Sequence, residues 1–333
     1  MIAPRYHVLG IGNALVDVIA HAEEDLLLAH GMRKGGMALV DEAQAEAIYA
    51  AMGPATEISG GSAANTLVGV ASLGAPAAFI GKVKADGLGR AFAHDIRAAG
   101  VNFVTPAAAD GAATGRSLIL VTPDGERTMN TYLGAAQHLR PDDVPPELVS
   151  DSAITYLEGY LWDPEDAKAA FLKAAGLAHE AGRLVALSLS DAFCVDRFRP
   201  EFLDLIRSRT VDLTFANEAE VKSLYQTADF DSAVAGLRDD AALGIVTRSE
   251  KGCLIVTREE THAVPAAPIA RFVDATGAGD LFAAGFLFGL ARGCELATAA
   301  EMGALCAAEV IQHLGARPEC SLRTLAEQSG YAV

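Results

Sequence analysis

The second half of the chain alternates between short apolar runs and longer amphipathic segments, and this alternation restricts the fold more than any other feature. The segments predicted as strands are 153–157, 184–189, 211–215, 244–247 and 253–257, and those predicted as helices are 164–181, 199–207 and 296–313. Such alternation is typical of a mostly parallel sheet with helices on both faces. Only 6% of the residues are aromatic although 51% are hydrophobic, so the core is expected to consist mainly of small aliphatic side chains. We therefore predict one large three-layer α/β/α domain over residues 1–333.

Charge and cysteine content exclude several classes of function. The chain has 26 basic and 43 acidic residues, a net charge of -17, and no local basic patch that would bind a nucleic-acid backbone. Its five cysteines lie far apart, which argues against a metal cluster or a disulfide framework. The N-terminus has no signal core, and no run approaches the roughly 20 apolar residues of a membrane span. We expect a cytoplasmic protein, monomer or homodimer, that acts on small molecules.

The stretch from Asp274 to Asp280, with the sequence DATGAGD, is predicted to bind an anion. An apolar run (270–273), predicted as a strand, precedes it, and a buried helix (281–287) is predicted to follow. Backbone N–H groups at a glycine turn and at a helix N-terminus attract negative charge. A carboxylate beside them suits phosphoryl transfer to a hydroxyl, because the amides stabilise the phosphoryl group while the carboxylate accepts the proton. An ordinary helix N-cap with an acidic first turn is the alternative that spacing leaves open.

Two stretches of the N-terminal third combine polar groups with small or apolar neighbours. Asn13 and Asp17 interrupt the apolar run 7–20, where a carboxylate is costly unless ligand hydroxyls or a neighbouring turn bind it. This run is not a dinucleotide-binding fingerprint, because Leu15 stands where the third glycine belongs. The second stretch, 59–65 (SGGSAAN), leads into a predicted helix with Ser62 as its N-cap. A hydroxyl-rich ligand would fit there, and so would a tight turn with nothing bound.

These stretches resemble the two signatures of the ribokinase-like (pfkB) sugar and nucleoside kinases. DATGAGD followed by LFAAGF resembles the C-terminal signature, and the stretch 60–65 with the small-residue helix up to Gly74 resembles the N-terminal one. The resemblance extends over roughly residues 5–318. It implies a catalytic base at Asp280 and an anion hole at Gly277, Ala278 and Gly279. It also implies that the acceptor is bound by Asp17, Gly60, Gly61 and Asn65.

The segment 114–132 predicts two further strands around the turn sequence Pro123-Asp124-Gly125. Together with strands from the stretches of about 12–20 and 36–41, they would form a small sheet that stands off the main domain. The resemblance identifies this sheet, with its third part at about 112–133, as a lid that covers the acceptor and keeps water from the phosphoryl group.

On the nucleotide side, the resemblance implies ATP as co-substrate and Mg²⁺ as cofactor. Asn217 and Glu220 match a short Asn-x-x-Glu motif in which Glu220 would hold the ion through water. Ser249 replaces the first glycine of a family pattern around ATP, which puts the backbone path there in doubt. The other residues expected near ATP are Thr247, Gly252 and Thr276. The oxygen-rich loop around Asp274 also suggests a monovalent cation such as K⁺, and no P-loop sequence occurs in the chain.

The resemblance leaves the acceptor open between sugars and nucleosides. The stretches 12–17, 187–193 and 215–218 are similar to those of family members that phosphorylate adenosine. An apolar slot suits a purine face, and the residues expected to line it are Met37, Leu39, Leu133, Tyr160 and Leu161. We therefore expect transfer to the primary hydroxyl of adenosine, which gives AMP. The alternatives are a sugar kinase of the ribokinase, fructokinase or 2-keto-3-deoxygluconate kinase type, and a nucleoside- or sugar-binding sensor without turnover.

Overall fold

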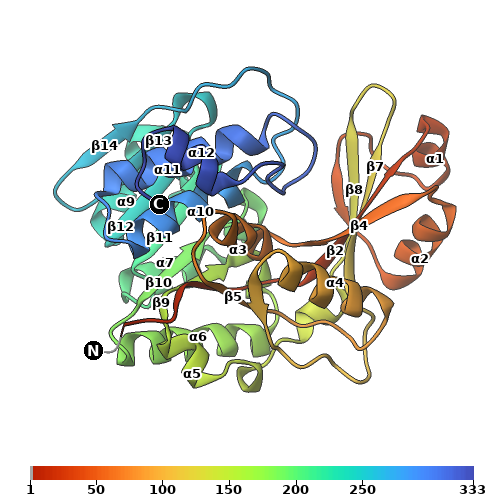
Figure 1. Cartoon of the computed structure of the whole chain (residues 1–333), viewed down its shortest axis with the longest axis horizontal. Helices are drawn as coiled ribbons and strands as arrows, with labels where there is room; N and C mark the ends of the chain where they lie inside the picture. Colours follow the sequence, from red (N-terminus) through yellow and green to blue (C-terminus); the bar gives the residue numbers. More distant parts are fainter. Residues whose placement is uncertain (1–2) are drawn as a thin grey trace.

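A nine-stranded sheet forms the centre of the molecule, as seen in a computed structural model that describes residues 3–333 (Figure 1). Its strand order is β14-β13-β12-β11-β10-β9-β1-β5-β6, and all neighbours pair in parallel except β12 with β13 and β13 with β14. The predicted mostly parallel sheet is therefore confirmed. The strands are β1 (Tyr6–Ile11), β5 (Ala77–Ile80), β6 (Val101–Phe103), β9 (Ser152–Glu158), β10 (Leu184–Ser188), β11 (Leu213–Asn217), β12 (Leu243–Thr247), β13 (Cys253–Val256) and β14 (Thr261–Val264).

Helices cover both faces of this sheet, as the alternation predicts. Successive strand side chains point to opposite faces, so in β1 Val8 packs into one hydrophobic cluster while Leu9 and Ile11 pack into the other. The cluster around Val8 includes side chains of α3 (Ser62–Ser72), α4 (Gly87–Ala98), α10 (Ala278–Ala291), α11 (Leu296–Val310) and α12 (Leu322–Gln328). The cluster around Leu9 includes side chains of α5 (Pro146–Ser150), α6 (Glu165–Glu180), α7 (Ala192–Arg207), α8 (Glu218–Leu224) and α9 (Phe230–Asp240).

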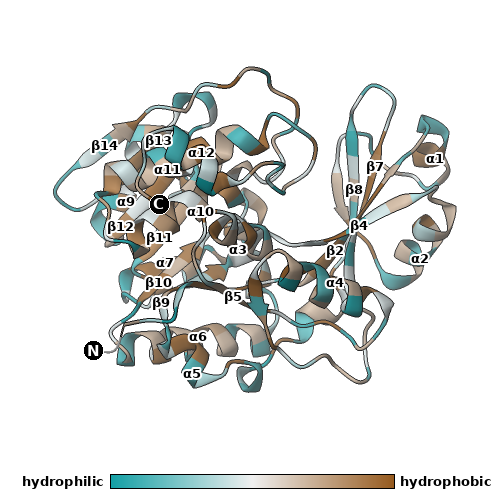
Figure 2. Ribbon diagram, viewed as in Figure 1, coloured by the Kyte–Doolittle hydropathy of each residue, from teal (hydrophilic) through white to brown (hydrophobic). Residues whose placement is uncertain are grey.

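The helices differ in how much of their surface is buried. In Figure 2, α4 shows both hydrophilic and hydrophobic segments, and its buried residues are Gly89, Phe92 and Ile96. Helix α10 is buried from Leu281 to Gly289, as its apolar sequence predicts. Close packing of α10 on α11 requires Gly285, because a Cβ there would lie 2.4 Å from the carbonyl oxygen of Met302. Within residues 3–333, no helix combines the length and apolar character that a bilayer crossing requires.

A second, five-stranded sheet stands to one side of the body, with α1 (Glu24–Ala29) and α2 (Glu42–Ala51) on its outer side (Figure 1). Its order is β3-β8-β7-β2-β4. The strands are β2 (Leu15–His21), β3 (Met37–Leu39), β4 (Ala55–Gly60), β7 (Gly115–Val121) and β8 (Arg127–Tyr132). The predicted small sheet is thus present, and β4 is an addition to it. The sequence of β4, with exposed Thr56 and Glu57, has no apolar run to indicate a strand.

Three segments depart most from the prediction. Residues 270–273 form a loop instead of a strand; the N–H groups of Val273 and Asp274 donate to the carbonyl oxygen of Ile311, at 2.9 and 3.3 Å, and not to a neighbouring strand. Helix α3 begins at Ser62, with Gly61 as its N-cap, so that Ser62 is not the cap. Helix α7 begins at Ala192, earlier than predicted, and bends at Phe198.

Candidate active site

The cleft at the carboxyl ends of the central strands, roofed by the small sheet, has a volume of about 850 Å³. Ligands of open parallel sheets bind beyond the carboxyl ends of the strands. Asn13, Asp17 and Asn65 line this cleft from the N-terminal part of the chain, and Gly277 and Asp280 line it from the C-terminal part. The two predicted halves of the site therefore face one another across a single cleft.

Asp280 lies in the first turn of α10, whose N-cap Gly277 has a left-handed backbone with φ of 79°. Its carboxylate accepts hydrogen bonds from Ser62 Oγ at 2.6 Å and from Asn65 Nδ2 at 3.0 Å. Burial raises the pKa of Asp280, while these two hydrogen bonds and the charge of Arg317 oppose the rise. The start of α3 thus fixes the orientation of a carboxylate at the start of α10. Sequence reasoning treated Ser62 only as a cap and missed this contact.

A buried carboxylate, Glu158, lies at the end of β9 and binds residues of the N-terminal part of the cleft. It accepts hydrogen bonds from the backbone N–H of Asn13 at 3.3 Å, from Asn13 Nδ2 at 2.7 Å and from the N–H of Ala63 at 2.9 Å. Burial raises the pKa of Glu158 to about 7. Because the amide nitrogen of Asn13 faces Glu158 and that of Asn65 faces Asp280, both amide oxygens remain buried without a donor. A ligand that supplies O–H or N–H groups would satisfy them.

Asp17 lies on β2 and is partly exposed to the cleft. Burial of its other sides raises the pKa of Asp17 to about 6, against the opposing charges of Arg317 and Arg127. Gly60 packs behind it, since a Cβ there would lie 2.5 Å from the carboxylate. Gly61, with φ of 100°, is equally restricted, because its Cβ would lie 2.1 Å from the carbonyl oxygen of Asn13. Of the two glycines, Gly61 lines the cleft and Gly60 supports it from behind.

Four of the five apolar residues predicted to face the ligand line the cleft, namely Met37, Leu39, Leu133 and Tyr160. Met37 and Leu39 are 54% and 57% exposed on β3. Leu161 is the exception, because it is 1% exposed and lies in the core cluster beneath the sheet. Residues 159–162 form a single 3₁₀ turn in which neighbouring side chains diverge, so that Tyr160 and Leu161 cannot both face the cleft.

Further residues line the cleft that the sequence analysis does not predict, among them Ser117, Ile119, Met129, Phe193 and Arg197. The i, i+2 spacing of Ser117 and Ile119 is the signal that could have placed them.

Among the residues predicted to lie near ATP, Asn217 and Glu220 form a capping box at the start of α8. Glu220 Oε2 accepts from the N–H of Asn217 at 2.9 Å, and Glu220 Oε1 accepts from Asn217 Nδ2. Burial raises the pKa of Glu220 to about 7. Each carboxylate oxygen accepts one bond and keeps a lone pair, so Glu220 could accept a hydrogen bond from a water of Mg²⁺, an ion that usually keeps several waters. Across residues 3–333, no group of three or more acidic, His or Cys side chains could hold a metal by itself.

Thr247, at the end of β12, and Thr276 line the cleft together. Ser249 lies in a shallow depression next to it and has φ of 52°, so it keeps the left-handed conformation that glycine would adopt freely. Gly252, with φ of 80°, packs against the backbone, where a Cβ would lie 2.0 Å from the carbonyl oxygen of Val264. The turn 249–252 therefore has a left-handed backbone at both Ser249 and Gly252, and only Gly252 lacks room for a side chain.

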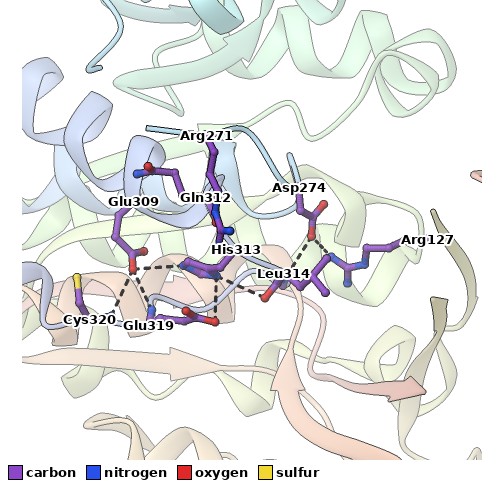
Figure 3. A network of polar contacts seen from close by, with 10 residues as sticks. Arg127, Arg271, Asp274, Glu309, Gln312, His313, Leu314, Glu319 and Cys320 are labelled. Carbon is purple, nitrogen blue, oxygen red and sulfur yellow. Dashed lines mark hydrogen bonds and ion pairs between the residues drawn. The ribbon is translucent and has the colours of Figure 1, made fainter. Parts of the chain in front are cut away.

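Asp274 joins the small sheet to residues 274–280, the turn that is predicted to bind an anion and is called the anion-binding turn below (Figure 3). It accepts from the N–H and Oγ of Thr276 at 3.0 and 2.7 Å and from the N–H of Gly315 at 3.0 Å, and it forms an ion pair with Arg127 of β8. Arg127 also lies 3.1 Å from Thr276 Oγ. Burial alone would raise the pKa of Asp274, but its hydrogen bonds and the charge of Arg127 lower it. The carboxylate predicted to bind a monovalent cation is therefore paired with an arginine that sequence reasoning missed.

The fold and the cleft together define a kinase of the ribokinase-like class: a mostly parallel sheet, an accessory sheet over its carboxyl edge, and a helix N-terminus with a carboxylate at the cleft. Residues 42–323 match the family model of the pfkB family carbohydrate kinases, and the chain belongs to this family. It is an ATP-dependent kinase.

Similar proteins include both nucleoside and sugar kinases by name. The crystal structure of adenosine kinase from Sinorhizobium meliloti has 52% sequence identity and a TM-score of 0.91, covering 98% of this chain and 99% of that one. The crystal structure of a probable sugar kinase from Rhizobium etli has 50% identity and a TM-score of 0.92, with the same coverage. Adenosine kinase of Saccharomyces cerevisiae is 29% identical over 328 residues, or 92% of this chain and 94% of that protein.

Proposed function

We propose that this kinase transfers the terminal phosphoryl group of ATP to the primary hydroxyl of adenosine, which gives AMP. The observation that carries the proposal is that polar groups and large apolar side chains line the same cleft; these two sets of residues are called its polar part and its apolar part. Asp17 and the free amide oxygens of Asn13 and Asn65 form the polar part, which suits ribose hydroxyls. Met37 and Leu39 belong to the apolar part, which suits a purine face. The similarity to two proteins named adenosine kinase agrees with this acceptor.

In this proposal, Asp280 orients the acceptor hydroxyl and accepts its proton as the new O–P bond forms, while the bond between the terminal phosphorus and the bridging oxygen of ATP breaks and ADP leaves. Ser62 and Asn65 hold the carboxylate in place, and the backbone amides of residues 277–279 stabilise the negative charge of the transferred group. Mg²⁺ neutralises phosphate charge when it is bound, and Glu220 would hold it through water. The small sheet covers the acceptor and limits access of water, which would otherwise hydrolyse ATP.

The acceptor is tested by a coupled assay of ADP release with adenosine, inosine, ribose, fructose and 2-keto-3-deoxygluconate at matched concentrations. We expect adenosine to exceed every sugar by about 10² in kcat/KM or more, because a sugar leaves the apolar part of the cleft empty. Saturation by a sugar with no response to adenosine would refute the nucleoside assignment in favour of the sugar-kinase alternative, for which the relative from Rhizobium etli is named. Saturable binding of adenosine without ADP release from any acceptor would favour a sensor.

Replacing Arg127 by glutamine is expected to lower kcat about tenfold to a hundredfold, because a positive charge is lost beside the anion-binding turn. The ADP-release assay measures this change. Arg323, which pairs with Glu327 on α12, supplies the control R323Q, whose kcat is expected to equal that of the wild type. Equal kcat in R127Q and wild type would show that Arg127 serves only as a structural partner of Asp274.

We further propose that a monovalent cation binds near Asp274 and orders the anion hole. Both Asp274 oxygens already accept hydrogen bonds or pair with Arg127, so a cation would have to share this carboxylate with the arginine or replace it. The same assay in potassium, sodium and choline salts tests the proposal. Activity that is indifferent to this exchange in wild type and in R127Q alike would contradict it.

A further inference from the structure

The segment that joins α11 to α12, residues 311–321, passes behind both halves of the cleft. Ile311 accepts hydrogen bonds from the backbone of residues 273 and 274, and the N–H of Gly315 donates to Asp274. Ala316 packs against the N-cap of α10, where a Cβ on Gly277 would lie 2.7 Å from the Ala316 Cα. This connecting segment therefore sets the position of the anion-binding turn.

Glu309, at the end of α11, anchors the connecting segment (Figure 3). It accepts hydrogen bonds from the backbone N–H groups of Glu319 at 3.0 Å and Cys320 at 3.3 Å, and it lies 3.3 Å from His313 Nε2. Both Glu309 and His313 have side chains that are only 10% exposed. Hydrogen bonds to Glu309 thus hold the two ends of the segment close together. This restricts the position of Arg317, which lies between them.

The guanidinium group of Arg317 reaches from this loop to the N-terminal half of the site. Its Nη2 donates to the carbonyl oxygen of Ser59 and lies 3.0 Å from Ser59 Oγ, and its Nη1 lies 3.5 Å from the carbonyl oxygen of Ala64. Ser59 is itself fixed to Asp95, because its N–H and Oγ donate to Asp95 Oδ2 at 2.8 and 2.6 Å. Arg317 therefore holds both ends of the turn that joins β4 to α3.

That turn carries groups that touch each of the two carboxylates in the cleft. Gly60 packs directly against Asp17, and Ser62 donates to Asp280. Two carboxylates in one cleft repel each other, and the Asp280 charge raises the pKa of Asp17. The charge of Arg317 acts against this, because it lowers the pKa of both Asp17 and Asp280.

Arg317 keeps its own charge at neutral pH. Burial lowers the pKa of Arg317 to about 10, and the nearby carboxylates Asp17, Asp95 and Asp280 oppose the decrease. The other charged or titratable groups that interact with one of the two carboxylates are Arg127 on β8, Tyr156 and Glu158 on β9, and Tyr160 in the 3₁₀ turn 159–162. Arg127, which is paired with Asp274, lowers the pKa of Asp17, whereas Arg317 lowers the pKa of both Asp17 and Asp280.

We propose that Arg317 is a positioning residue for phosphoryl transfer: it fixes the turn between β4 and α3 and supplies the positive charge that allows Asp17 and Asp280 to share one cleft. This inference rests on the proposed roles of these two aspartates. Through Arg317, the C-terminal part of the chain contributes to the acceptor half of the site, although no local sequence motif indicates this contribution. Arg317 does not touch the reacting atoms and acts only through the turn and the two carboxylates.

The test compares R317K, which keeps the charge, with two neutral variants, R317Q and R317M, by the pH profile of kcat/KM. In the neutral variants we expect the acid limb of the profile to move to higher pH by about one unit, because an opposite charge nearby favours the ionised carboxylates. Activity requires the ionised carboxylates of Asp17 and Asp280. A higher pKa of these groups therefore lowers activity at low pH and leaves activity at high pH unchanged. We expect R317K and the control R323Q to keep the wild-type acid limb.

A neutral variant that folds and has the wild-type acid limb would overturn the proposal, whatever its thermal stability, and so would equal shifts in R317K and R317Q. R317Q retains a side-chain donor for Ser59, so it remains informative if R317M does not fold. Unfolding of both neutral variants beside a folded R317K would assign Arg317 to folding alone and would also refute the proposal. The profile is measured with whichever acceptor the wild type phosphorylates, so an error in the acceptor leaves this test intact.

Discussion

Replacing Asp280 by asparagine is expected to lower kcat about 10²- to 10⁴-fold, since a positioned general base contributes that much to proton transfer. Asparagine has nearly the same volume and keeps one oxygen that can accept from Ser62 Oγ. Its new Nδ2 can donate to Asn65 if the amide of Asn65 turns over and presents its free oxygen, so the fold and the site geometry should be preserved. We therefore expect KM for the acceptor and the melting temperature to change little. Steady-state ADP release, calorimetric binding of the acceptor and thermal unfolding measure the three quantities.

Asp231 provides a matched control for this substitution. It is an exposed aspartate in the first turn of α9, as Asp280 is in the first turn of α10, but it does not line the cleft. D231N is expected to keep the wild-type kcat. Turnover in D280N that equals turnover in D231N would return Asp280 to the role of an ordinary first-turn acid. A D280N variant that has lost acceptor binding as well as kcat would show that the carboxylate contributes to binding in the ground state.

The features that could be predicted from the sequence are those that local patterns encode. Alternating strands and helices indicate a mostly parallel sheet because each element buries its own periodic apolar face. The anion-binding turn is contiguous from Asp274 to Asp280, so its glycines and its acid are visible in seven residues. The lining side chains of Met37 and Leu39 follow from the alternation of a strand.

The features that were missed depend on contacts between distant parts of the chain. Arg127 and Asp274 are far apart in sequence, and their ion pair follows only from the position of the small sheet over the body. The contact of Arg317 with Ser59 likewise joins the C-terminal connecting segment to β4. The prediction that Leu161 faces the cleft is wrong because a short 3₁₀ turn has no periodicity that a sequence pattern reveals.

Replacing Gly277 by alanine is expected to lower kcat about a hundredfold, because a misplacement of about 1 Å near the reacting groups has an effect of that size. Gly277 has φ of 79°, a conformation that costs an alanine about 1–2 kcal/mol. The added Cβ would also lie 2.7 Å from the Cα and Cβ of Ala316. Either α10 or the connecting segment 311–321 must then move, and both position the anion-binding turn. Steady-state kcat and the free energy of unfolding measure the two effects.

Alanine substitutions at two other glycines distinguish the effect of backbone strain from the effect of moving the site. Gly293 has φ of 75° with no atom within 4 Å of a Cβ, so G293A is expected to lose similar stability to backbone strain while keeping the wild-type kcat. Gly279 lines the cleft, has no positive φ and also has open space around a Cβ, so G279A should keep its stability. If phosphate occupies that space, G279A loses turnover without losing stability. Wild-type kcat in G277A would contradict an anion hole at residues 277–279, because the methyl group cannot be accommodated there without moving the amides.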